Sequence, residues 1–169
     1  MKLAHCALEG RTGHDAGRDL LAKLYFETTG EPIPPILTGQ WGKPYFPDSP
    51  WHFSISHTRN HAFCVLSENN VAVDAEELDR QINQALAEKI LSPGEKAQFD
   101  AAADKQRALL TFWVLKEAAA KLSGRGLQGY PNHTDFSLDD PRVREIDGCL
   151  VAFFTEGENY ALCYSRPHG

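Results

Sequence analysis

Residues 52–77 read HFSISHTRNHAFCVLSENNVAVDAEE, and this stretch decides the fold that we expect for the chain. It contains three short β-type runs, at 52–57, 61–67 and 71–77, which are separated by the turn-forming sequences TRN and ENN. Short connections of this kind join neighbouring antiparallel strands. The stretch therefore predicts an antiparallel β-meander of three strands.

The flanking sequence adds helices and further strands. Residues 15–27 have helical spacing, and so do residues 80–122, where SPGE (92–95) has the pattern of a capping box. Proline-rich residues 31–50 are expected to be loop or extended chain. Further strands are expected at 2–8, 143–147, 149–154 and 160–165, the last three forming a second meander.

The order of these elements repeats one theme twice, although no sequence repeat is visible. We therefore expect an α+β protein that forms a single unit over residues 1–169. This unit is expected to consist of two pseudo-symmetric halves, each a helix-packed antiparallel β-meander. The N-terminal half covers about 1–77 and the C-terminal half about 78–169.

Composition excludes several classes of protein. The 169 residues are 42% hydrophobic and 24% charged, which is typical of a globular protein. A net charge of −6 argues against a general nucleic-acid binder, although it allows a local basic pocket for one phosphorylated ligand. No apolar run approaches the roughly 20 residues that span a bilayer, and the first ten residues do not form a signal peptide. We therefore expect a cytoplasmic protein with no membrane partner.

The chain has four cysteines, and each lies in a short apolar run. None has the CxxC spacing or the paired histidine that would indicate zinc. We therefore expect reduced core thiols at Cys6, Cys64, Cys149 and Cys163.

Residues 112–127, FWVLKEAAAKLSGRGL, predict a helix that ends in small residues. Glu117 and Lys121 lie one turn apart on the same face as Trp113, and Lys116 lies beside them. A Glu and a Lys at this spacing form a common solvated pair, and they also suit a site. The helix alone leaves both interpretations open.

The run VAVDAEE (71–77) places Ala72, Asp74 and Glu76 on one face of a strand. Two carboxylates about 7 Å apart can bind one hard cation, and Mg²⁺ prefers oxygen ligands of this kind. A solvated, acidic strand end is the equally acceptable alternative.

The run HFSISH contains neighbouring Ser56 and His57, which suggests a nucleophilic pair. Because neighbours on a strand point to opposite faces, Ser56 and His57 are expected to lie out of hydrogen-bond reach. His57 is then either a partly buried strand histidine or a donor to an anion.

Four motifs together resemble the 4'-phosphopantetheinyl transferases, particularly the compact pseudo-dimeric type that activates peptide and polyketide synthetases. These motifs are WGKPYF (41–46), FSISH (53–57), VAVDAEE (71–77) and FWVLKEAAAKLSGRGL (112–127). Their order and spacing are similar to the family's GKP, F-N-(L/I)-S-H, G-(I/V)-D-(I/V)-E and W-(S/T)-x-K-E motifs. Ser54 replaces the family's Asn and Val114 its Ser or Thr, and neither change removes a charge.

The resemblance implies roles for individual residues. It implies metal-binding carboxylates at Asp74, Glu76 and Glu117, and catalytic roles for Glu117, as the base for a serine proton, and Lys121. It further implies a set of residues that bind coenzyme A: Arg18, Lys43, Pro44, Ser56, His57, Lys116 and Lys121.

The resemblance also implies an activity. Members of this family transfer the 4'-phosphopantetheine arm of coenzyme A to a serine of an apo acyl or peptidyl carrier protein. The reaction uses Mg²⁺, with Mn²⁺ as a possible substitute, and releases adenosine 3',5'-bisphosphate. A monomer is expected. A non-catalytic coenzyme A or nucleotide-binding protein and a metal-dependent phosphodiesterase remain the alternatives. The basic residues Lys105 and Arg107 are candidates for docking the acidic carrier.

Overall fold

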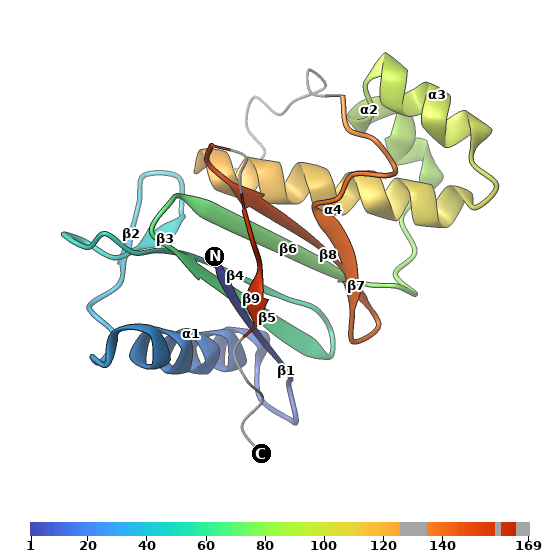
Figure 1. The fold of residues 1–169 in the computed structure, drawn as a ribbon. Helices are drawn as coiled ribbons and strands as arrows, with labels where there is room; N and C mark the ends of the chain where they lie inside the picture. Colours follow the sequence, from blue (N-terminus) through green and yellow to red (C-terminus); the bar gives the residue numbers. More distant parts are fainter. Residues whose placement is uncertain (126–134, 158–159, 165–169) are drawn as a thin grey trace.

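A four-stranded and a three-stranded β-sheet lie side by side, and each is covered by one long helix (Figure 1). A two-stranded antiparallel hairpin forms a third, smaller sheet. The computed structural model describes residues 1–125, 135–157 and 160–164. Its elements in chain order are β1 (Lys2–Ala7), α1 (Gly13–Thr29), β2 (Leu37–Thr38), β3 (Pro44–Tyr45), β4 (His52–His57), β5 (His61–Ser67), β6 (Val71–Glu77), the 3-10 turn η1 (Gln84–Leu86), α2 (Ala87–Ile90), α3 (Pro93–Ala101), α4 (Lys105–Ser123), β7 (Val143–Ile146), β8 (Cys149–Thr155) and β9 (Cys163–Tyr164).

The α+β class is confirmed, but the first meander is not formed as expected. Strands β4 and β5 pair antiparallel, as the TRN turn predicts, and the first sheet has the order β4-β5-β1-β9. Strand β6 leaves this sheet after the ENN turn and pairs with β8 in a second sheet of order β6-β8-β7. The turn sequence predicts a change of direction, and it does not specify which strand the next segment joins.

The second meander also differs from the expectation. Strands β7 and β8 form the expected antiparallel pair. The following segment contributes only β9, which pairs in parallel with β1 of the first sheet, while residue 165 of the expected strand lies outside the described residues. The chain thus returns from the second sheet to the first.

The connections within the two sheets follow one pattern. The first unit contains β1, α1, β4 and β5, and β5 lies between β4 and β1 in the sheet, with β9 added outside β1. The second contains β6, α4, β7 and β8, with β8 in the middle. The sheets divide between Ser67 and Val71, whereas the halves expected from the sequence divide after residue 77.

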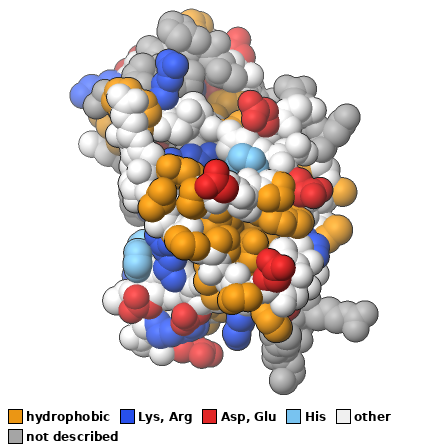
Figure 2. Space-filling model, turned by 90° about the vertical axis from the view of Figure 1, so that its left-hand side faces the viewer, with side chains coloured by type: hydrophobic (Ala, Val, Ile, Leu, Met, Phe, Trp, Pro, Cys, Tyr) orange, Lys and Arg blue, Asp and Glu red, His pale blue; other side chains and the backbone are white. Residues whose placement is uncertain are grey.

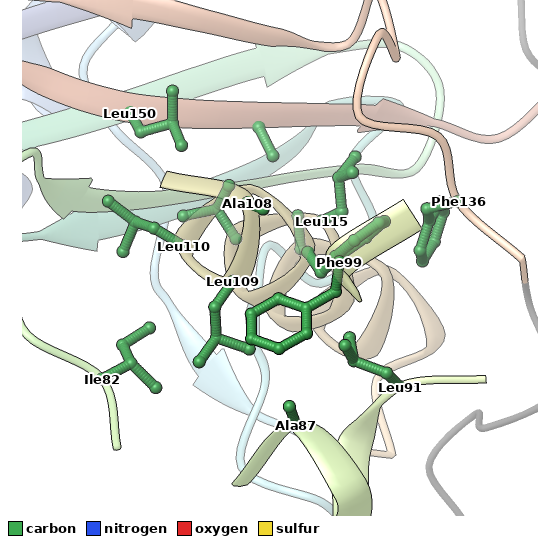
Figure 3. Packing of buried hydrophobic residues seen from close by; sticks show 14 of the residues in the cluster. Ile82, Ala87, Leu91, Phe99, Ala108, Leu109, Leu110, Leu115, Phe136 and Leu150 are labelled. Atoms are coloured by element: carbon green, nitrogen blue, oxygen red, sulfur yellow. The ribbon is translucent and has the colours of Figure 1, made fainter. Parts of the chain in front are cut away.

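Alternation along the strands creates three apolar clusters. Ala62, Cys64 and Leu66 of β5 face α1, whereas Phe63 and Val65 face the second sheet. In β6, Val71, Val73 and Ala75 face the first sheet, and Ala72 faces α4. Figure 3 shows the cluster around α4, where Phe99 of α3 packs beside Leu109 and Leu115 of α4. Successive residues of β6 therefore alternate between the space separating the sheets and the helix.

Local capping fixes the ends of the helices. The Ser92 hydroxyl accepts from the Glu95 amide, and the Glu95 carboxylate accepts from the Ser92 amide, so the predicted capping box is confirmed. Helix α4 ends at Gly124, whose φ of 70° is the left-handed conformation that favours glycine. This end leaves Lys121 in the last turn of α4, which packs on β6.

Serine side chains bridge the seam between β4 and β6, which lie side by side at the junction of the sheets. The Ser54 hydroxyl accepts from the Val73 amide at 3.1 Å, and the Ser56 hydroxyl accepts from the Ala75 amide at 3.1 Å. Both serines are buried. The hydroxyls thus satisfy buried backbone donors that the β6–β8 ladder leaves on the other side of β6.

Replacing Ser56 with alanine is expected to lower the free energy of unfolding by about 1–3 kcal/mol, because the buried Ala75 amide loses its acceptor. Urea unfolding of the full chain measures the change. Ser137→Ala is the matched control, since the exposed Ser137 hydroxyl also accepts a backbone amide, that of Asp139. The control should change stability by less than about 0.5 kcal/mol. Equal losses in the two variants would contradict the role of the seam.

Candidate active site

The acidic face of β6 lies against α4. Because Ala72 packs in the α4 cluster, Asp74 and Glu76, which share its face of the strand, also point toward that helix. Glu117 and Lys121 approach them from α4, one turn apart. The predicted alternation of β6 and the predicted face of the helix therefore meet at one place.

Asp74 is the most buried carboxylate of this group, with 6% of its surface exposed. Its Oδ1 atom accepts from Lys121 Nζ at 3.0 Å and from the Ser56 hydroxyl at 3.4 Å. Its Oδ2 atom is buried and has no hydrogen-bond partner among the described residues. Burial raises the pKa of Asp74 to about 6; Lys121 opposes the rise, and Glu76 and Glu117 add to it. The single positive charge of Lys121 therefore does not offset the burial of Asp74 and the negative charges of Glu76 and Glu117.

Two side chains, Trp113 and Arg80, contact the Glu76 carboxylate. Trp113 of α4 donates from Nε1 to Glu76 Oε1 at 3.2 Å. Arg80, four residues further along the chain, forms an ion pair with the same oxygen and lies 5.5 Å from the centre of the Trp113 ring. These contacts hold the Glu76 carboxylate on the α4 side of β6.

Glu117 completes the group of carboxylates. Burial raises its pKa, Lys121 opposes the rise, and Glu76 adds to it. The charge of Glu76 thus contributes to the raised pKa of both Asp74 and Glu117. An oxygen-only donor set with one orphaned buried oxygen fits a hard divalent cation such as Mg²⁺, because the cation would supply the missing charge.

A pocket of about 230 Å³ adjoins Lys121 on one side of this group. Lys43 and Pro44, from the loop and strand of the β2–β3 hairpin, line it together with Ser54 and Gly124. Lys43 Nζ donates to Asn70 Oδ1 at 2.8 Å. Burial lowers the pKa of Lys43. Two lysines, Lys43 and Lys121, therefore line the pocket.

The face that carries the β2–β3 hairpin is partly apolar. Figure 2 shows hydrophobic side chains gathered near the centre of this face, with charged and histidine side chains around them. The hairpin region contributes three large exposed apolar side chains, Leu37, Trp41 and Tyr45. Trp41 also lines the pocket beside Lys43. This face can accept a flat apolar group next to a positive one.

His57 lies on the other side of the carboxylates, at the exposed end of β4. Its ring packs against the start of α1 so closely that a Cβ atom on Gly13 would lie 2.2 Å from His57 Cγ. His57 shares a pocket of about 650 Å³ with Glu76 and Arg80. Ser56 points away from His57 into the seam, so the predicted separation of these two neighbours is confirmed.

Comparison with known sequences identifies the family. A model of the 4'-phosphopantetheinyl transferase superfamily matches residues 70–166, which include β6 and α4. The chain belongs to this superfamily.

Several curated relatives have the same family name. The chain is 36% identical over 114 residues to the 4'-phosphopantetheinyl transferase AcpT of Escherichia coli, covering 64% of this chain and 56% of that protein. It is 30% identical over 158 residues to the 4'-phosphopantetheinyl transferase psf-1 of Bacillus pumilus, covering 87% of this chain and 63% of that protein. The match to gsp of Aneurinibacillus migulanus is 29% over 134 residues, covering 77% and 55%. The chain thus spans little more than half the length of these relatives.

Two of the residues expected to bind coenzyme A, Lys116 and Arg18, have described contacts away from the three carboxylates. Lys116 points to the other side of α4, where its Nζ atom forms a buried ion pair with Glu95 Oε1 at 2.7 Å. Arg18 lies on α1, which packs on the first sheet. Burial raises the pKa of the Cys64 thiol, and the charge of Arg18 offsets part of that rise. Lys116 thus contacts Glu95 of α3, and Arg18 lies near Cys64 of the first sheet.

Sequence reasoning missed three residues that shape this site. Arg80 pairs with Glu76 across the turn that follows β6, and a spacing of four residues indicates such a pair only within a helix. Asn70 links Lys43 to α4, because its Nδ2 atom donates to the Leu122 carbonyl at 2.9 Å. Ser54 bridges the seam. The roles of Asn70 and Ser54 depend on distant partners, so no local pattern indicates them. The trailing residues 126 and 127 of the helix motif lie outside the described residues.

Within the described ranges, none of the helices is both long enough and apolar enough to cross a lipid bilayer.

Proposed function

We propose that this chain transfers the 4'-phosphopantetheine arm of coenzyme A to a serine of an apo carrier protein, in a reaction that depends on Mg²⁺ and releases adenosine 3',5'-bisphosphate. The observation that carries the proposal is the convergence of Asp74, Glu76 and Glu117 beside Lys121, within the segment that matches the superfamily. The two β-α-β-β units would then be the pseudo-symmetric halves of a monomeric, cytoplasmic transferase.

The carboxylates would hold the metal ion. Asp74 Oδ2 is available to a cation, whereas Glu76 would exchange its Arg80 partner for one. When bound, Mg²⁺ or Mn²⁺ would offset the charge that builds on the diphosphate leaving group. Glu117 adjoins the same group, and its raised pKa makes it a better proton acceptor than an ordinary surface glutamate. We assign to Glu117 the removal of the proton from the carrier serine.

Coenzyme A would lie across the carboxylates between the two pockets. Lys121 contacts Asp74 and also lines the pocket that contains Lys43, so its ammonium group can neutralise a phosphate oxygen next to the metal. Lys43 and Pro44 would receive the adenine end, beside the exposed Trp41. His57 would donate to a phosphate from the other pocket.

The docking site for the carrier needs revision at one residue. Lys105 Nζ donates to the carbonyls of Phe99, Asp100 and Ala102, so it caps the C-terminal end of α3. Arg107 forms an ion pair with Glu145 at the surface. We propose that Arg107 remains accessible to an acidic carrier, and that Lys105 serves mainly to hold α3 against α4.

Incubation of the chain with coenzyme A, Mg²⁺ and an apo carrier protein tests the function. The carrier mass is expected to increase by one phosphopantetheine arm, and chelation of Mg²⁺ should stop the increase. Hydrolysis of coenzyme A without modification of the carrier would support a phosphodiesterase instead. Binding of coenzyme A with neither product would support a non-catalytic binding protein. Several apo carriers, both acyl and peptidyl, should be supplied, so that a negative result with one partner does not decide the outcome.

A further inference from the structure

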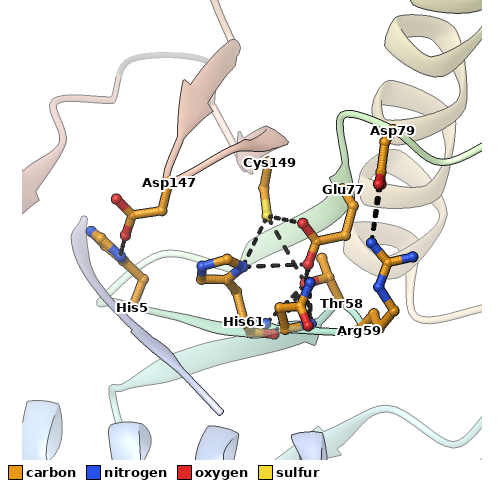
Figure 4. A network of polar contacts seen from close by, with 9 residues as sticks. His5, Thr58, Arg59, His61, Glu77, Asp79, Asp147 and Cys149 are labelled. Atoms are coloured by element: carbon orange, nitrogen blue, oxygen red, sulfur yellow. Dashed lines mark hydrogen bonds and ion pairs between the residues drawn. The ribbon is translucent and has the colours of Figure 1, made fainter. Parts of the chain in front are cut away.

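A second group of potential ligands lies at the end of the space between the two sheets. Figure 4 shows His61, Glu77 and Cys149 pointing toward one another from β5, β6 and β8. His61 Nδ1 lies 3.3 Å from Glu77 Oε1, and Cys149 Sγ lies 3.6 Å from both His61 Nδ1 and Glu77 Oε2. This group is separate from Asp74, Glu76 and Glu117, which face the opposite side of the second sheet.

Strand register explains why these three residues meet. Glu77 and Cys149 are directly opposite each other in the β6–β8 ladder, so their side chains share one face. That face also carries Val73 and Val151, which pack between the sheets. His61 shares the inward face of β5 with Phe63. The fold therefore directs an imidazole, a carboxylate and a thiol into one space.

We propose that His61, Glu77 and Cys149 bind a zinc ion. A tetrahedral zinc ion has bonds of about 2.3 Å to sulfur and about 2.0–2.2 Å to nitrogen and oxygen. These lengths place the ligand atoms about 3.4 Å apart for nitrogen and oxygen, and about 3.6 Å apart when sulfur is one of the pair. The separations of His61 Nδ1 from Glu77 Oε1 (3.3 Å) and from Cys149 Sγ (3.6 Å) match two of these edges to within about 0.1 Å. Cys149 Sγ lies 3.6 Å from the other carboxylate oxygen, Glu77 Oε2, and one atom from each of the three residues lies within 4.8 Å of the other two.

The chemistry of the donors selects the metal. A thiolate and an imidazole favour zinc over Mg²⁺, which prefers oxygen ligands. Binding would release the Cys149 thiol proton to solvent, and the neutral His61 ring would keep its proton on Nε2. The charges of Cys149 and Glu77 would then balance the two positive charges of zinc. The three donor groups would lose little further contact with water when the ion binds. Cys149 is already buried, and the His61 and Glu77 side chains are only 20% and 12% exposed.

Neighbouring groups already hold Glu77 in position. Thr58 Oγ1 donates to Glu77 Oε1 at 2.6 Å, and the Asn60 amide donates to the same atom at 3.0 Å. Hydrogen bonds of this kind orient metal ligands in known sites. A water molecule would supply the fourth ligand. The alternative is that the three residues form a metal-free network of hydrogen bonds.

Metal binding to the full-length chain distinguishes these two cases. The protein, stripped of metal and supplied with excess Mg²⁺, is titrated with Zn²⁺ and separately with Co²⁺. We expect one tightly bound zinc ion per chain, a higher melting temperature with zinc, and a thiolate-to-cobalt charge-transfer band in the ultraviolet. Cys149→Ser, Glu77→Gln and His61→Gln should each weaken zinc binding by about a hundredfold or more, and Cys149→Ser should abolish the band.

Cys64→Ala is the matched control, because Cys64 is also buried in a strand of the same protein, where its Sγ atom contacts the Val65 carbonyl. This variant should retain the zinc ion and the cobalt band. Circular dichroism establishes whether each variant is folded. Because the three substitutions lie in three different strands, the test needs only one of the variants to fold. No zinc binding by the wild-type chain, or equal binding by folded wild-type and Cys149→Ser proteins, would overturn the proposal.

Discussion

Asp74→Asn is expected to slow the transfer of phosphopantetheine by about a hundredfold or more, although the shape of the side chain is retained. The substitution removes the charge that would hold the metal ion and leaves the contact with Lys121 available. The rate of carrier modification at saturating Mg²⁺ and coenzyme A measures the effect. Asp79→Asn is the control, since Asp79 follows the same strand but pairs with Arg59 at the surface. It should leave the rate nearly unchanged.

The same variant separates a role in the site from a role in folding. Because the pKa of Asp74 rises from 3.8 to about 6 on burial, its ionised form opposes folding above that pH when metal is absent. In the presence of a chelator at pH 7 to 8, Asp74→Asn should therefore be at least as stable as the wild-type chain. The stability contributed by protonation of Asp74 is present below pH 4 and is lost as the pH rises through 6, so the advantage of the variant should shrink on acidification.

A large loss of stability at neutral pH would instead mean that Asp74 serves the fold. Near-normal transfer by Asp74→Asn would remove Asp74 from the metal site.

Glu95→Ala is expected to lower the free energy of unfolding by about 3–5 kcal/mol. Glu95 is fully buried, and its loss removes an ion pair with the buried ammonium group of Lys116. It also removes the acceptor of the Ser92 and Phe136 amides. Urea unfolding measures the change. Replacing one member of the Glu95–Lys116 pair should thus lower the free energy of unfolding more than most single substitutions in the chain.

Two further proteins test the cause of this loss. The double variant Glu95→Gln with Lys116→Met removes both charges and keeps an acceptor for the Ser92 amide, so it should recover part of the stability. Glu88→Ala breaks an exposed ion pair with Lys96 and should cost less than about 1 kcal/mol. If Glu95→Ala cost no more than Glu88→Ala, the buried pair would not stabilise the fold.

Local patterns predicted much of this structure. The strand period placed Asp74 and Glu76 on one face, and the helix period placed Glu117 and Lys121 on another. Both faces are used as expected, because each depends only on the geometry of its own element. The capping box at Ser92 was likewise readable, since its two partners lie three residues apart.

Pairings between distant segments could not be predicted in this way. The ENN turn after β5 is compatible with a third strand in the same sheet, and only the register with β8 shows that β6 belongs to another. Lys116 has the helical position of a site residue, yet the buried Glu95 provides its partner on the opposite side. Cys149 has no neighbouring histidine in sequence, and the fold supplies one from 88 residues away. Sequence spacing therefore gave no indication of zinc.

The serine seam determines how the molecule can deform. Within each sheet, backbone ladders lock neighbouring strands together, but β4 and β6 are joined by hydroxyl groups that can rotate about their side-chain bonds. His57 belongs to one side of this seam, and Asp74 and Glu76 belong to the other. The separation between the histidine and the carboxylates therefore depends on side-chain hydrogen bonds and on the apolar cluster between the sheets, rather than on a continuous backbone ladder.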